Sequence, residues 1–323
     1  MKFLITWKNK LENVYKKFPR IVSYLGKLVF SLCCFFLLRY NCGYNAFLSN
    51  IWVVIILSVF CAFVPARYLM FIIMVYTIIQ IFSLSVGAGV VCATILLIIY
   101  FIYFRFDERY VYLMFLMPVF YMARLPLLIP LVLAVSFPFN SVVIVLFGTV
   151  IYYMIRYINL NAAVISGMTQ ESEYTKMSFV VNGIFTNEEF LYTLIIMFVV
   201  FLLAFYLKKI NMNQATNLAI FAGCGAYIIL CIIANLVFET ITGVRLVTIV
   251  AGSIVSALLA AAVVYALLPL DYTRLETFEF EDDEYHYYVR AVPKAIIRKE
   301  AVRVKKINSR KETDSRKVKG NDQ

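Results

Sequence analysis

Charged side chains are scarce in this chain, and histidine is almost absent. Asp, Glu, Lys and Arg make up 15% of the 323 residues, whereas soluble domains carry about 25%. Hydrophobic residues make up 63%, which excludes an ordinary soluble globular protein. The one histidine, His286, excludes multi-histidine metal ligation and histidine-based catalysis within a membrane. The composition therefore predicts an integral membrane protein that crosses the bilayer several times.

Motifs that carry enzyme chemistry are missing as well. The chain contains no P-loop, no HExxH, no GxSxG and no dinucleotide-binding GxGxxG pattern. Its seven cysteines show no CxxC spacing, so we expect neither disulfides nor a metal site. We accordingly expect no catalytic residues, no metal and no cofactor. An enzyme built from scattered Ser, Asn, Asp or Arg residues is the open alternative to this non-enzymatic interpretation.

Long apolar runs dominate residues 21–270, which we interpret as the transmembrane domain. A helix needs about 20 residues to cross a hydrocarbon core about 30 Å thick. The predicted fold is all-α, a polytopic membrane protein with about eight transmembrane helices. These helices are expected at 21–38, 50–65, 68–86, 88–104, 141–158, 190–207, 215–237 and 246–268.

A further apolar segment, residues 110–136, is interrupted by prolines, each of which obstructs a continuous helix. The prolines are Pro118, Pro126 and Pro130. Basic residues favour the cytoplasmic side, and Arg109 and Lys208 share that side only if the segment adds no net crossing. Two full crossings need about 40 residues. We therefore predict a re-entrant hairpin of two half-helices, with its turn near 123–126.

Both ends of the chain are basic. Residues 1–20 place Leu4, Trp7 and Leu11 on one helical stripe among lysines, which is typical of a basic amphipathic helix lying on anionic lipids. Because basic segments stay inside, both termini are predicted to be cytoplasmic. The same count places the polar region 159–189 on the outer side.

The segment 271–293 joins acidic residues to a tyrosine-rich run. Acids followed by β-prone aromatic residues predict a short extended segment in the cytoplasmic tail that docks a cytosolic protein partner. The predicted docking residues are Glu281, Asp282, Asp283, Glu284, Tyr285, Tyr287 and Tyr288. Residues 294–323 are basic and lack apolar periodicity, which predicts a disordered tail. We favour a solvated role for this tail over nucleic-acid binding.

Arg124, in the predicted hairpin turn, is the main candidate for a ligand-binding residue. A guanidinium at membrane depth is costly, so it usually faces a cavity or a partner. Broken helices are where transporters place their substrates, and a cation there suits an anion or a lipid phosphate. Gln80 and Asn235 are the other polar candidates for this cavity. The alternatives are an arginine that reaches the interface and amides that only bond neighbouring helices.

Three stretches carry a resemblance to a known group. They are FRFDERYVYLMFLMPVFYMARLPLLIPLV, FGTVIYYMIRYINL and FEFEDDEYHYYVRAVPK, about 60 residues in all. In this order they resemble an uncharacterised family of bacterial multi-spanning membrane proteins that carry the generic label transporter permease. The resemblance implies a bacterial plasma membrane and no established activity.

Two functions follow from these patterns. The first is a transporter or permease with its site at Arg124 and a tail that docks a partner. The second is a membrane anchor or scaffold for a cytoplasmic or envelope assembly, in which the hairpin is structural and the tail does the binding. No oligomeric state is predicted.

Overall fold

The computed structural model describes residues 18–104, 113–168, 171–210, 214–238, 243–267, 276–281 and 286–291. The chain divides into two compact units, Met1–Leu268 and Pro269–Gln323. The first unit contains the 3-10 helix η1 (Phe139–Ser141) and the α-helices α2 (Pro19–Cys42), α3 (Ile51–Phe63), α4 (Ala66–Phe82), α5 (Val86–Phe104), α6 (Leu113–Met122), α7 (Leu128–Ser136), α8 (Val142–Leu160), α9 (Ala162–Gly167), α10 (Glu173–Phe185), α11 (Glu188–Leu207), α12 (Ala215–Phe238) and α13 (Gly243–Leu267).

A described helix coincides with each of the eight apolar runs predicted as spans. Five of these helices, α2, α8, α11, α12 and α13, are long and apolar enough to cross a membrane. The apolar parts of α3, α4 and α5 are shorter than these spans; α3 has 13 residues, which is about 20 Å of helix at 1.5 Å per residue. The chain is thus a polytopic helical protein with five candidate spans among its described residues, compatible with a membrane location.

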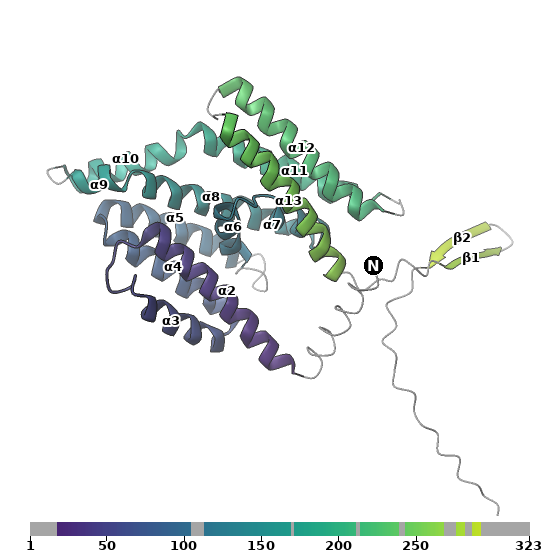
Figure 1. Ribbon diagram of the computed structural model, residues 1–323, viewed down its shortest axis with the longest axis horizontal. Helices are drawn as coiled ribbons and strands as arrows, with labels where there is room; N and C mark the ends of the chain where they lie inside the picture. The colour runs from purple at the N-terminus through teal and green to yellow at the C-terminus, as the bar shows by residue number, and fades with distance from the viewer. Residues whose placement is uncertain are drawn as a thin grey trace, which may run out of the picture. The chain divides into compact units, whose positions relative to one another are not determined.

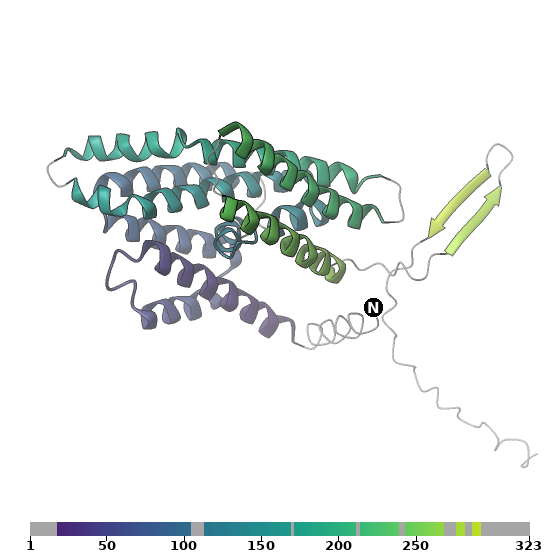
Figure 2. The ribbon, with the colours of Figure 1, turned by 45° about the horizontal axis from the view of Figure 1, so that its top comes forward.

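The helices of the first unit form two groups with a central layer between them. Helices α2 to α5 lie together on one side, α11 to α13 lie on the other, and α6, α7 and α8 lie between (Figures 1 and 2). Helix α7 is packed against α11 and α13, and every residue from Leu128 to Val135 is buried. A helix that is apolar all round belongs in such a core.

The region 159–189 contains two helices, α9 and α10, and α10 packs against α5 and α8. Glu173, at the start of α10, fastens this helix to the rest of the unit. Its carboxylate accepts hydrogen bonds from the Lys176 ammonium at 2.8 Å and from the backbone N–H of Gly87 at 2.6 Å. Both bonds favour the charged carboxylate, so the pKa of Glu173 lies below its ordinary value, with Lys176 as the largest cause.

This lowered pKa predicts a pH-dependent stability. A carboxylate with a depressed folded-state pKa stabilises the fold above its unfolded-state pKa of about 4.3, and this contribution disappears as the pH falls through the folded-state value. We expect Glu173→Gln to lower the thermal unfolding temperature at pH 6, and we expect this difference from the wild-type chain to shrink as the pH falls toward 3. Thermal unfolding in detergent across that range measures the effect. An equal difference at both pH values would contradict it.

The second unit contains an antiparallel pair of strands, β1 (Glu276–Glu281) and β2 (His286–Ala291). In the register, the apolar pairs Phe278–Val289 and Phe280–Tyr287 alternate with pairs that include polar residues, such as Thr277–Arg290. This alternation is typical of a strand pair with two different faces. The strands lie within the segment predicted to be extended.

Several predictions fall outside the described residues. They concern the amphipathic helix in residues 1–17, the docking residues Asp282, Asp283, Glu284 and Tyr285, and the basic tail at 294–323. These stay predictions.

Candidate functional site

The predicted break in the proline-rich segment coincides with a defined turn between α6 and α7. Backbone N–H groups of Arg124 and Leu125 donate to the carbonyls of Tyr121 and Phe120 at 3.0 and 2.8 Å. This pair of hydrogen bonds caps the C-terminus of α6. It requires that the residue after the helix adopt the left-handed backbone conformation, and this residue is usually glycine. Here the residue is Arg124, with φ of 61°.

An arginine in this conformation costs roughly 1–2 kcal/mol, because its Cβ crowds the following carbonyl. Gly252 of α13 lies directly against the turn, where any Cβ would collide with the Arg124 carbonyl oxygen. The turn is therefore held tightly from outside. Strained residues of this kind cluster at ligand sites, where their surroundings determine their conformation.

The Arg124 side chain lines a cavity of about 420 Å³, which falls within the range of small-molecule sites. The guanidinium makes no hydrogen bond or ion pair with any residue that the structure describes. The remaining cavity residues come from the turn and from α6, α8, α11, α12 and α13. They are Tyr121, Met122, Pro126, Tyr152, Tyr153, Arg156, Glu189, Tyr192, Thr193, Tyr227, Cys231, Thr248 and Ile249.

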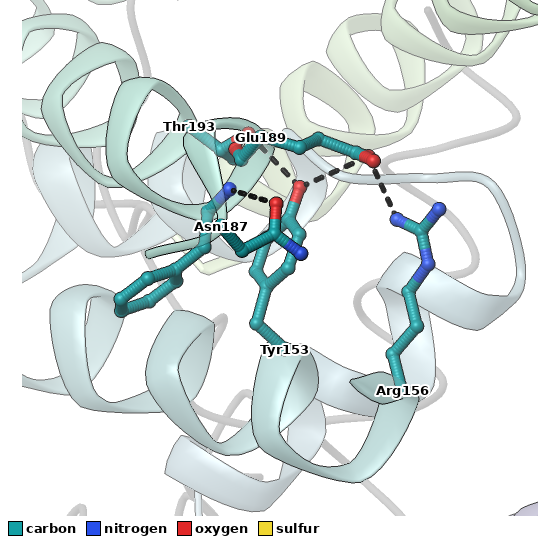
Figure 3. A network of polar contacts seen from close by, with 6 residues as sticks. Tyr153, Arg156, Asn187, Glu189 and Thr193 are labelled. Atoms are coloured by element: carbon teal, nitrogen blue, oxygen red, sulfur yellow. Dashed lines mark hydrogen bonds and ion pairs between the residues drawn. The ribbon is translucent and has the colours of Figure 1, made fainter. Parts of the chain in front are cut away.

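One wall of the cavity is a polar network between α8 and α11 (Figure 3). Arg156 forms an ion pair with Glu189 at 2.8 Å. The Tyr153 hydroxyl lies 3.4 Å from the Glu189 carboxylate and 2.9 Å from the Thr193 hydroxyl. Tyr153 and Arg156 are three residues apart and therefore share one face of α8. These contacts hold the oppositely charged side chains of Arg156 and Glu189 in defined positions.

Local sequence explains why Glu189 lies at this wall. Asn187 caps the N-terminus of α11, since its side chain accepts a hydrogen bond from the backbone N–H of Phe190 at 3.3 Å. Acidic residues in the first turn of a helix are stabilised by the helix dipole. Thr193, one turn later, donates to the Glu189 carbonyl at 2.6 Å. The start of α11 is thus set within about one residue.

Tyr121 adds an unsatisfied polar atom to the cavity. Its ring stacks on Tyr152 with centroids 4.5 Å apart. Its hydroxyl oxygen is buried and has no partner of normal hydrogen-bond geometry among the described residues. Buried hydroxyls are nearly always bonded, so such an atom points to a water or ligand in the cavity.

The predicted site residues are only partly brought together. Arg124 and Pro126 line the cavity. Pro118 lies inside α6, and Pro130 is in the first turn of α7, where its missing N–H breaks no helical bond. Asn235, half-buried on α12, is not among the cavity residues.

Gln80 is buried away from the cavity, and its amide is already bonded. Its Oε1 accepts from the backbone N–H of Asn45 at 2.9 Å, and its Nε2 donates to Tyr76 at 3.1 Å and to Ser49 at 3.3 Å. Gln80 therefore fastens the connection between α2 and α3 onto α4.

The sequence-based predictions missed Arg156, Glu189 and Tyr153 as site residues. A signal was present in the run YYMIRY, because an arginine within an apolar helix requires a partner. The partner, Glu189, lies 33 residues further along the chain, and nothing local pairs the two. Among the described residues, no cluster of three His, Cys, Asp or Glu side chains offers a metal site.

The chain matches no family model, no curated protein and no solved structure in the comparisons made. The resemblance to a bacterial permease-like family is therefore still a prediction.

Proposed function

We propose that this protein is a permease-like membrane protein that binds an anion in the cavity at Arg124. The observation that carries the proposal is the Arg124 guanidinium, which has no partner among the described residues and lines a cavity large enough for a small molecule. Arg124 lies on a strained turn that α13 holds in place. Such a charge is costly at membrane depth unless it serves a ligand or a water-filled path. We place the protein in a bacterial plasma membrane with both termini in the cytoplasm.

In this proposal α6, the turn and α7 form a re-entrant hairpin entered from the cytoplasmic side. Support comes from the contacts between α6 and α8. Met117 lies against Gly148, and Tyr121 lies against Tyr152, so α6 and α8 run in the same direction. The second arm returns to the end of α11, where Lys208 donates to the Phe137 carbonyl at 2.9 Å. In this proposal the hairpin begins and ends on the same side of the membrane, so it adds no net crossing.

Hydrogen bonds between connections and the neighbouring helices support the proposed sides. Near the proposed outer face, Asn45 bonds Gln80, and Glu173 bonds Gly87. At the proposed inner face, the Lys27 ammonium donates to the Val64 carbonyl at 3.0 Å. Each bond joins segments that the distribution of basic residues assigns to the same side.

A second candidate function is a membrane scaffold that uses its tail. The strand pair β1–β2 favours it, since among the described residues each strand has one edge without a neighbour, where a further strand from a cytosolic partner can add. In that case the Arg124 region is structural and needs no path for water. The permease function requires water to reach residue 124, so it falls if water does not.

Cysteine labelling tests this access. In a cysteine-free background, Arg124→Cys is expected to react with a small charged thiol reagent, because a permease cavity opens to water. Leu131→Cys is the matched control for a buried hairpin residue and should stay unreactive. Ser166→Cys should react in intact cells and Lys209→Cys only after permeabilisation. An unreactive Arg124→Cys variant would favour the scaffold, and reversed sides for residues 166 and 209 would overturn the topology.

A further inference from the structure

Arg156 already forms an ion pair with an acid of the protein itself, Glu189. The Glu189 carboxylate lies 2.8 Å from the Arg156 guanidinium, and the two side chains keep 27% exposure for Arg156 and 20% for Glu189. The pair thus lines the cavity and is not sealed inside the core. A carboxylate and a phosphate use the same guanidinium N–H donors. An incoming anion therefore competes with Glu189 for Arg156.

Arg124 offers the second guanidinium, and no described residue occupies it. The described cavity residues include two arginines and one acid, so they present a net positive charge to an anion that enters. Guanidinium groups bind phosphates and carboxylates through planar, paired hydrogen bonds. Two guanidiniums on one ligand favour a phosphate, since its three terminal oxygens can satisfy both, whereas a carboxylate has only two oxygens.

The size and the remaining walls indicate that the ligand is larger than inorganic phosphate. A volume of about 420 Å³ far exceeds the roughly 10–15 Å³ that a cavity needs to hold one water on the same measure. Tyrosines 121, 152 and 227 supply ring surfaces and hydroxyl groups. Tyrosine suits an organic group that is partly polar and partly apolar. The Tyr121 hydroxyl, buried and without a partner among the described residues, is available to such a ligand.

We infer that the cavity binds an organic phosphate, and that its phosphate displaces Glu189 from Arg156 and lies between Arg156 and Arg124. This inference rests on the proposed anion site. Glu189 then acts as an internal competitor: it orients Arg156 while the cavity is empty and weakens phosphate binding. Removing its charge should strengthen binding, which is the opposite of what loss of a structural acid would do.

Isothermal calorimetry on the full chain in phosphatidylcholine nanodiscs tests the inference. The probes are glycerol 3-phosphate as a soluble organic phosphate, dihexanoyl phosphatidate as a lipid headgroup, and glycerol as the uncharged control. We expect Glu189→Gln to bind a phosphate probe about three- to fivefold more tightly than the wild-type chain, as loss of a partly exposed ion pair implies. Glutamine keeps the shape and can still accept from Tyr153.

Glu188→Gln is the matched control, because this exposed neighbour carries the same charge outside the cavity. It should leave the dissociation constant unchanged. Binding of glycerol 3-phosphate identifies a soluble ligand, and binding of dihexanoyl phosphatidate alone identifies a lipid; either supports the inference. If neither phosphate binds, or if Glu189→Gln binds no more tightly than Glu188→Gln, the inference is wrong. The proposed anion site survives that result if the Arg124→Cys variant reacts with the thiol reagent, and it falls if that variant does not react.

Discussion

Gly252→Ala is expected to destabilise the first unit by about 1–3 kcal/mol or more, the usual cost of overpacking a tight contact. The added Cβ collides with the carbonyl oxygen of Arg124. This oxygen belongs to a backbone that two hydrogen bonds to α6 hold in the left-handed conformation. Because a backbone atom cannot rotate away as a side chain can, α13 must separate from the turn. Thermal unfolding in detergent, followed by circular dichroism, measures the loss.

Gly225→Ala is the matched control for this substitution. Gly225 lies in α12, and a Cβ added there meets no atom within 4 Å. Alanine favours a helix over glycine by about 1 kcal/mol, so this variant should be as stable as the wild-type chain or slightly more stable. If both variants unfold at the same temperature, the close contact between Gly252 and the turn does not exist.

Lys208→Met is expected to destabilise the same region by about 1.5–3 kcal/mol, the range for a hydrogen bond to a charged group. The Lys208 ammonium lies at the end of α11 and closes the C-terminus of α7. It donates at 2.8, 3.1 and 2.9 Å to the carbonyls of Ala134, Val135 and Phe137. Methionine has a similar length and no donor, so three carbonyls near a helix end lose their partner. The unfolding temperature in detergent measures the effect.

Lys209→Met tests whether the position or only the charge matters. The Lys209 ammonium lies 4.5 Å from the ring centroid of Phe205, a contact worth about 0.5–1 kcal/mol at an exposed site. It makes no bond to α7 within the described chain. Its loss should therefore change stability much less than the loss of Lys208. Equal effects would show that Lys208 does not close α7.

The helices and the break near Arg124 were predictable, because apolar runs and prolines act locally. Each of the eight runs coincides with a described helix, and α6 and α7 flank the predicted turn. The number of spans was not predictable to the same degree. Helix α3, with 13 residues, is shorter than its apolar run, since Asn50 begins it with a side-chain hydrogen bond and Pro65 follows its end.

The candidate site was less predictable than the fold. Arg124 stands out as a lone cation between prolines, whereas Arg156 and Glu189 become a pair only when α8 packs on α11. Gln80 illustrates the opposite case: a buried amide in an apolar run has the composition of a site residue, but neighbouring backbone and hydroxyl groups use its bonding capacity. Polar residues in apolar runs are therefore informative only together with their partners.

The attachments of α7 limit how the cavity can open. Lys208 ties its far end to α11, and Gly252 holds the adjoining turn against α13. The arm, α11 and α13 should therefore move as a rigid body. Helix α8 contacts α11 through the Arg156–Glu189 ion pair and α6 through the Tyr121–Tyr152 stack. A ligand that takes Arg156 from Glu189 would remove this ion pair, so the contact between α8 and α11 would depend on whether the cavity is occupied.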